Sequence, residues 1–147
     1  TEGSQTIVLF IKLSSDLERI GDHAINIASR AQKLAEDETH FSQDALKEIS
    51  IMESLCNNIL DELIILDYDE FKNIVDKTQH QFTVNQLIRL KEKKCSTENS
   101  IIYTKILTDF ERIGDHGLNI AESLYHIRKI MKQMKIIFTR KDELWRI

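Results

Sequence analysis

Two pairs of carboxylates, each with its members four residues apart, are the side chains of this sequence best suited to chemistry. Glu18 and Asp22 form the first pair, and Glu111 and Asp115 form the second. Residues four apart on a helix lie one above the other on the same face, where two like charges destabilise the helix by roughly 0.2–0.5 kcal/mol. A bound cation would relieve that repulsion, so the spacing predicts metal-binding positions on two helix faces.

Both pairs belong to a segment that occurs twice. DLERIGDHAINIA at residues 16–28 and DFERIGDHGLNIA at residues 109–121 are identical at ten of thirteen positions, with an offset of 93 residues. A single Glu-x-x-x-Asp on a helix is more often a solvated face with salt bridges, and Arg19 and Arg112 could supply the opposite charge. The recurrence favours a shared function and indicates the duplication of a unit about three helices long.

Two histidines extend the list of candidate metal ligands. His23 and His116 directly follow the aspartates of the two pairs, although a histidine at such a position more often makes a hydrogen bond at the edge of the core.

Four long helices are needed to position these residues. The chain has no proline, and its apolar residues recur at alternating spacings of four and three, which is typical of bundle helices. We predict helices over residues 4–37, 42–66, 69–94 and 97–134, with Ser42 as candidate cap of the second and either Ser96 or Thr97 as candidate cap of the fourth. Short connections predict one all-α domain over residues 1–147, an antiparallel up-and-down bundle.

The heptad register of the first helix predicts which residues face the bundle. The a and d positions are Leu17, Ile20, Ala24 and Ile27. This register turns the carboxylate pair away from the interior and places Asp16 and His23 beside the seam. Gly21 and Gly114 reduce helix propensity by up to about 1 kcal/mol each, so we expect another helix or a bound ion to approach them closely.

Composition narrows the classes of function. The 147 residues carry a formal net charge of −4, which disfavours general binding to nucleic-acid phosphates or anionic lipids. The most apolar stretch near the start, residues 7–11, is too short to span a bilayer. Cys56 and Cys95 show no metal-binding spacing. Nucleophile constellations and glycine-rich phosphate loops are not found in the sequence, so we predict that the protein is not an enzyme.

Residues 17–24, LERIGDHA, resemble the signature of the PhoU family of phosphate-uptake regulators and of the PhoU-like cytoplasmic domains in sodium/phosphate cotransporter-related proteins. The resemblance implies two copies of a three-helix unit, with the signature on the third helix of each. Residues 4–37 would then be the last helix of a first copy, and the remaining helices would be a complete second copy.

The resemblance also implies a set of metal ligands. In the family, multinuclear metal clusters, iron or zinc among them, are associated with the motif positions held here by Glu18, Asp22, Glu111 and Asp115. Asp76 falls where the family has a second acidic motif, and His80 stands where an aspartate or asparagine is usual. Asp76 and His80 are four residues apart, so on a helix they can ligate one metal ion together.

These observations predict a cytoplasmic regulatory domain of phosphate transport or signalling, either independent or the cytoplasmic part of an inner-membrane protein. It would bind Fe, Zn, Mg²⁺, Mn²⁺ or Ca²⁺. Its expected partners are a transporter or sensor at the membrane and a second copy of itself, without nucleic acid and without membrane insertion of this segment. The alternatives are a metal-free structural or interaction bundle and a di-metal oxidase, although the Glu-x-x-His spacing of such oxidases is missing.

Overall fold

In a computed structural model the chain forms four long helices joined by short connections. They are α1 (Glu2–Glu36), α2 (Gln43–Asp61), α3 (Tyr68–Lys91) and α4 (Thr97–Leu144). The structure describes the backbone of residues 1–61 and 68–144, and the side chains of residues 1–61 and 70–135. These ranges contain no strand, so the predicted all-α class is confirmed.

The predicted helix boundaries agree with the structure to within about two residues, except at the ends of the second, third and fourth helices. The predicted end of the third helix at residue 94 is wrong, because α3 ends at Lys91. The predicted end of the second helix, residues 62–66, lies outside the described residues. The predicted end of the fourth helix at residue 134 is wrong, because α4 continues to Leu144. Residues 135–144 contain neither glycine nor proline, so no residue there interrupts the helix.

Side chains and left-handed residues define several helix ends. The hydroxyl of Ser42 accepts a hydrogen bond from the Ala45 amide at 3.2 Å, so the predicted cap of α2 is confirmed. Of the two candidate caps of α4, Ser96 is the one found, since its hydroxyl accepts a hydrogen bond from the Asn99 amide at 3.1 Å. Shortly after α1 and α3 end, Glu38 has a φ of 50° and Lys93 a φ of 58°. These left-handed conformations cannot continue a right-handed helix, so the chain turns there.

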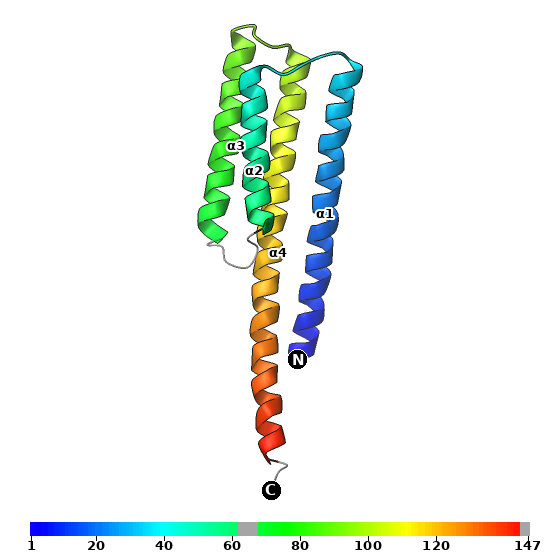
Figure 1. The fold of residues 1–147 in the computed structure, drawn as a ribbon, viewed down its shortest axis with the longest axis vertical. Coiled ribbons are helices and arrows are strands. Elements are labelled where there is room, and N and C mark those ends of the chain that lie inside the picture. Colours follow the sequence, from blue (N-terminus) through cyan, green and yellow to red (C-terminus); the bar gives the residue numbers. More distant parts are fainter. Residues whose placement is uncertain (62–67, 145–147) are drawn as a thin grey trace.

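The helices alternate in direction, and α4 is the central one (Figure 1). Its upper half packs against α2 and α3 on one side, while α1 packs along α4 on the other side. Ile49 of α2 packs against the cluster that Leu34 of α1 forms with Ile102 and Ile106 of α4. Completely buried side chains hold the three-helix unit together, namely Met52, Ile59, Tyr103 and Leu107. The fold is therefore a three-helix unit, α2 to α4, with α1 packed along α4.

A buried polar network fixes α2, α3 and α4 relative to one another. The Glu48 carboxylate accepts hydrogen bonds from Arg89 at 2.6 and 3.2 Å, from Asn85 at 2.7 Å and from the Tyr103 hydroxyl. Burial raises the pKa of Glu48, but the hydrogen bonds from Arg89, Tyr103 and Asn85 outweigh burial and leave this pKa below its usual value. The network sets how α3 lies against α4, which matters for the site described below.

The predicted heptad register of α1 is wrong at half of its seam positions. Leu17, assigned to the seam, has 53% of its surface exposed, whereas Asp16, assigned to the flank, has only 6% exposed. Ile20 and Ile27 are half-buried as predicted, but Asp16 and His23 replace Leu17 and Ala24, so the side of α1 that faces α4 is rotated by roughly 50° from the predicted one. Asp16 and His23 have polar partners on α4, so they can lie in the interface. The apolar pattern had assigned these positions to their neighbours Leu17 and Ala24.

None of the helices, in the ranges the structure describes, combines the length and apolar character needed to cross a membrane.

Candidate metal centre

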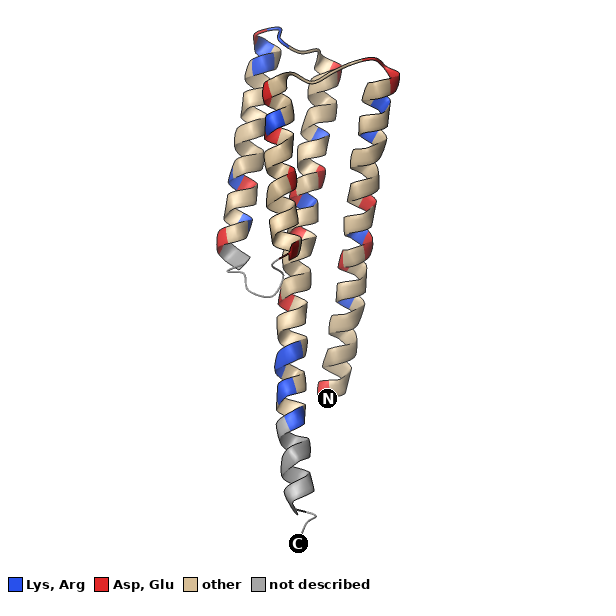
Figure 2. Ribbon diagram, viewed as in Figure 1, with Lys and Arg blue, Asp and Glu red and all other residues tan. Residues whose placement is uncertain are grey.

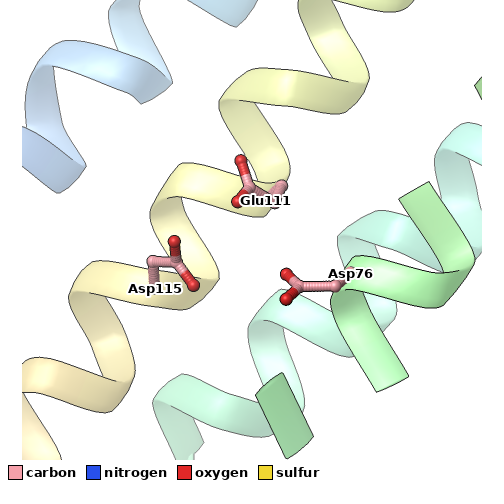
Figure 3. A group of neighbouring side chains, drawn as sticks. All are labelled: Asp76, Glu111 and Asp115. Carbon is pink, nitrogen blue, oxygen red and sulfur yellow. The ribbon is translucent and has the colours of Figure 1, made fainter. Parts of the chain in front are cut away.

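Three carboxylates converge between α3 and α4. Asp76 on α3 and Glu111 and Asp115 on α4 each place one oxygen so that the three atoms lie within 4.8 Å of one another (Figure 3). All three side chains keep some contact with solvent. Among the described residues this is the one group of three potential ligands from histidine, cysteine, aspartate and glutamate, and its hard oxygen atoms suit Mg²⁺, Ca²⁺, Mn²⁺ or iron.

The three carboxylates carry more negative charge than the neighbouring cation compensates. Burial and the neighbouring Asp115 carboxylate raise the pKa of Glu111, and Asp76 adds to this shift. Arg112 opposes it, with its Nε atom 3.5 Å from a Glu111 oxygen. Since the net shift of the Glu111 pKa is still upward, Arg112 compensates the carboxylates only in part, and a cation would be favourable there.

Gly114 lies where α4 packs against α2 and α3. A Cβ atom at Gly114 would lie 3.5 Å from Ile59 Cδ1 on α2 and 3.6 Å from Val75 Cγ1 on α3, which is ordinary packing contact, so the helix spacing does not require glycine there. Val75 directly precedes Asp76, so the packing of Val75 against α4 brings Asp76 beside the two carboxylates of α4. The predicted unusually close approach is therefore found neither at Gly114 nor at Gly21, where no atom outside α1's own helix backbone lies within 4 Å of such a Cβ.

The first carboxylate pair has different surroundings. Glu18 and Asp22 are exposed on α1, and no third carboxylate, histidine or cysteine joins them within the part of the chain that is described. Of the predicted metal ligands, the structure thus gathers three and leaves these two as an exposed pair. Both remain predicted ligands.

His23 and His116 make a reciprocal contact between α1 and α4. Nδ1 of His116 lies 2.8 Å from an oxygen of Asp16, and Nδ1 of His23 lies 2.8 Å from an oxygen of Asp109. The two imidazole rings stack, with centroids 5.9 Å apart and planes 21° apart. Neither ring belongs to the carboxylate group. One nitrogen of each proposed ligand is therefore engaged in holding the two helices together.

Sequence analysis missed this role of the two aspartates. The available signal was the repetition of aspartate and histidine seven residues apart in both copies, which places both on one side of each helix. Two antiparallel helices with the same pattern can pair each aspartate with the histidine of the other copy. The predicted apolar register of the first helix places Asp16 beside the seam and not within it.

The two aspartates differ in what holds their second oxygen. Arg30 donates to the second oxygen of Asp109. The position equivalent to Arg30 in the second copy is Ser123, and the second oxygen of Asp16 is buried without a hydrogen-bond partner, as is the Ser123 hydroxyl. Asn119 donates to the first oxygen of Asp16 at 3.3 Å. The interface is therefore symmetric at the histidines and asymmetric beside them.

His80 is the remaining predicted ligand. It is exposed on α3 one turn after Asp76, and the structure does not include it in the carboxylate group. Its role as a ligand stays a prediction.

Comparison with known proteins supplies a family. The PhoU domain profile matches residues 1–31 and 51–124. Relatives named phosphate-specific transport system accessory protein PhoU homolog include homolog 1 of Thermotoga maritima, 30% identical over 139 residues, and the protein of Borreliella burgdorferi, 31% identical over 137 residues. These alignments cover 86% and 83% of this chain.

The relatives are longer than this chain. The alignments cover 59% of the Thermotoga maritima protein and 60% of the Borreliella burgdorferi protein, so the chain spans about three fifths of each. A Clostridium acetobutylicum relative of the same description is 26% identical and is covered to 61%. No solved structure matches the chain.

Proposed function

This chain belongs to the PhoU family, and on that premise we propose that it is a non-enzymatic regulatory module of phosphate transport or phosphate signalling that binds a metal ion through Asp76, Glu111 and Asp115. The relatives are described as accessory proteins of the phosphate-specific transport system. The partner is then a transporter or sensor protein at the membrane. The module acts in the cytoplasm, either alone or as the cytoplasmic part of an inner-membrane protein.

One observation carries the metal proposal: three carboxylates from two helices meet within 4.8 Å. Bringing three negative charges together is costly unless protons or cations compensate them. Burial, and after it the Asp115 and Asp76 carboxylates, raise the pKa of Glu111, which agrees with such a cost. A divalent or trivalent ion would replace mutual repulsion by shared attraction, which supports the proposal that the group binds metal.

The donor set favours metals that prefer oxygen. The group contains three carboxylates and no nitrogen or sulfur ligand, which suits Mg²⁺, Mn²⁺, Ca²⁺ or iron. A shift of the exposed His80 side chain toward Asp76 would add an imidazole and increase the preference for iron or zinc. The proposal includes the sodium/phosphate cotransporter-related branch of the family, because the membrane partner can be a transporter of that kind.

The experiment is a comparison of two matched double substitutions. Protein purified without chelator is analysed for metal content and titrated calorimetrically with Mn²⁺. We expect Glu111→Gln with Asp115→Asn to abolish stoichiometric binding. The matched control, Glu18→Gln with Asp22→Asn, removes the same charges from α1 and retains binding.

Two outcomes would overturn the metal centre. The wild-type chain could take up no metal, or both double variants could bind Mn²⁺ as the wild type does. The first outcome would favour the metal-free bundle, for which the ion pair between Arg112 and Glu111 is the supporting observation. An optical iron-oxo band or oxygen consumption by the iron-loaded protein would instead favour the di-metal oxidase.

Self-association is a further part of the proposal. Phe10, Leu17 and Ile25 on α1 are 53%, 53% and 65% exposed, and together they present an apolar side to solvent. Burying this side against that of a second copy would remove it from water in both chains. Sedimentation velocity should show a dimer, and Leu17→Glu with Ile25→Glu should give a monomer. A wild-type chain that stays monomeric at tens of micromolar would refute this part alone.

A further inference from the structure

The charge of this chain is unevenly distributed along α4. Residues 123–135 contain four basic residues and no acidic one, whereas the other 134 residues contain 16 basic and 24 acidic ones. Figure 2 shows the basic residues gathered on the lower part of α4, beyond the end of α2. We call Arg128, Lys129, Lys132 and Lys135 the basic stripe.

The basic stripe lies on one side of its helix. At 100° per residue, Arg128, Lys129, Lys132 and Tyr125 fall within about 100° of arc. Ile127, which is 4% exposed, lies on the opposite side and packs inward. The stripe residues are all exposed, so the lower part of α4 is amphipathic, with a cationic outer side.

Three charges of the stripe have no acidic partner among the residues whose side chains are described. Arg128, Lys129 and Lys132 form no ion pair within the described part of the chain. The nearest acidic residue in sequence, Glu122, has contacts of 3.9 Å with Lys12 and with His126 instead. The carboxylates of the candidate metal centre are also too distant to screen the stripe. Asp115 precedes Lys129 by 14 residues, about 20 Å along the helix, against a Debye length of about 8 Å at physiological salt.

We propose that the basic stripe docks on the surface of an anionic lipid bilayer, with the lower part of α4 lying along the headgroups. Clusters of lysine and arginine on the outer side of an amphipathic helix are the usual means of attraction to anionic lipids. Tyr125, 56% exposed, provides apolar area on the same side of the helix. Tyrosine is well suited to the headgroup region, because its ring is apolar and its hydroxyl polar.

The composition of the stripe favours lipid over an acidic protein surface. Three of its four cations are lysines. A lysine ammonium is a strongly hydrated point charge on a flexible stem, which suits diffuse attraction to headgroups, whereas protein interfaces are enriched in arginine and depleted in lysine. The whole-chain charge of −4 argued against lipid binding, but its acidic excess lies outside residues 123–135. The docking is independent of metal at Asp76, Glu111 and Asp115.

Vesicle flotation of the full chain tests the proposal. We expect the wild-type chain to float with vesicles of phosphatidylcholine and phosphatidylglycerol at 0.1 M salt. It should not float with pure phosphatidylcholine vesicles, and binding should weaken at 0.5 M salt. Arg128→Gln, Lys129→Gln and Lys132→Gln together should lower the partition coefficient about 100-fold, at about fivefold per charge.

The matched control changes three exposed lysines elsewhere, Lys47→Gln, Lys91→Gln and Lys105→Gln, and therefore alters the net charge equally. It should bind vesicles within about twofold of the wild type. Helix content by circular dichroism verifies that both variants fold. The proposal is overturned if the wild-type chain does not float with anionic vesicles, if it floats equally with neutral ones, or if the stripe variant binds as well as the control. Salt-sensitive binding to an acidic protein or to RNA without vesicle binding would equally overturn it.

Discussion

The signature segments of α1 and α4 have nearly the same sequence but different surroundings. On α4, the pair Glu111 and Asp115 lies beside α3, which adds Asp76. On α1, Glu18 and Asp22 are exposed, and no described helix covers that side. The signature therefore supplies two ligands of a site, and the neighbouring helix determines whether a third carboxylate lies beside them.

The same contrast extends to the apolar residues. Tyr103 on α4 is completely buried under the three-helix unit, while its counterpart in the repeat, Phe10 on α1, is 53% exposed. Leu118 is 7% exposed, and its counterpart Ile25 is 65% exposed. The exposed side of α1 therefore has the residues of a covered face. Its apolar residues are typical of a helix that packs against other helices on two sides.

The largest expected effect concerns the two interface aspartates. Asp109→Asn leaves the Arg30 guanidinium without its carboxylate. Because Arg30 is only partly buried, we expect a loss of about 2–3 kcal/mol, below the roughly 3–5 kcal/mol of a fully buried ion pair. Asp16→Asn removes hydrogen bonds with no arginine involved and should cost about 1 kcal/mol of unfolding free energy. Urea unfolding with a common m-value measures both. Equal losses would show that the Arg30 contact contributes nothing and that the interface is energetically symmetric.

A smaller effect is expected from making the α4 site resemble α1. Asp76→Asn removes the third carboxylate and leaves two carboxylates four residues apart, as on α1. We expect Mn²⁺ affinity to fall by at least about tenfold, or 1.4 kcal/mol, in calorimetric titration. Glu70→Gln, which changes an exposed carboxylate on the same helix, is the matched control. An unchanged affinity would mean that the α1 and α4 pairs differ for another reason.

The glycines should respond in opposite directions. Gly21→Ala adds a methyl group to open space and should stabilise the chain by up to about 1 kcal/mol through helix propensity. Gly117→Ala places its Cβ 3.0 Å from Ile59 Cγ2, and Ile59 is completely buried, so the neighbour cannot move easily. We expect a net loss of about 1 kcal/mol, since overpacking exceeds the gain in propensity. Thermal unfolding measures the two shifts, and a stabilised Gly117→Ala would indicate looser packing of α2 on α4.

The smallest expected effect is a pH dependence that belongs to the α4 site. Because the pKa of Glu111 is raised in the folded chain, the folded state holds its proton to higher pH than the unfolded state. Stability of the metal-free chain should therefore fall slightly as pH rises from the usual glutamate pKa through the raised one. Glu111→Gln should remove this fall, and metal affinity should rise over the same range as the proton leaves. Glu18→Gln is the matched change on α1. A Glu111→Gln chain with an unaltered pH profile would contradict the raised pKa.

The helices and the duplicated motif were predictable because both depend on local sequence. Regular apolar spacing and the absence of proline predicted four helices, and Ser42 and Ser96 were recognisable as candidate caps. The register of α1 was not predictable from apolar residues alone. Asp16 and His23 are acceptable inside the interface only because their partners come from a segment about 90 residues away. A polar residue that is paired across an interface cannot be distinguished from a surface residue by spacing.

The sequence by itself determined that carboxylates would stand in pairs on two helix faces, since a helix places residues four apart on one side whatever surrounds it. Only the tertiary structure decided that one pair acquires Asp76 and the other does not. It also decided that the histidines bind aspartates across the α1–α4 contact. The physical reason is that helix geometry is set by bonds between near neighbours, whereas a ligand group or a buried ion pair exists only where packing brings distant segments together.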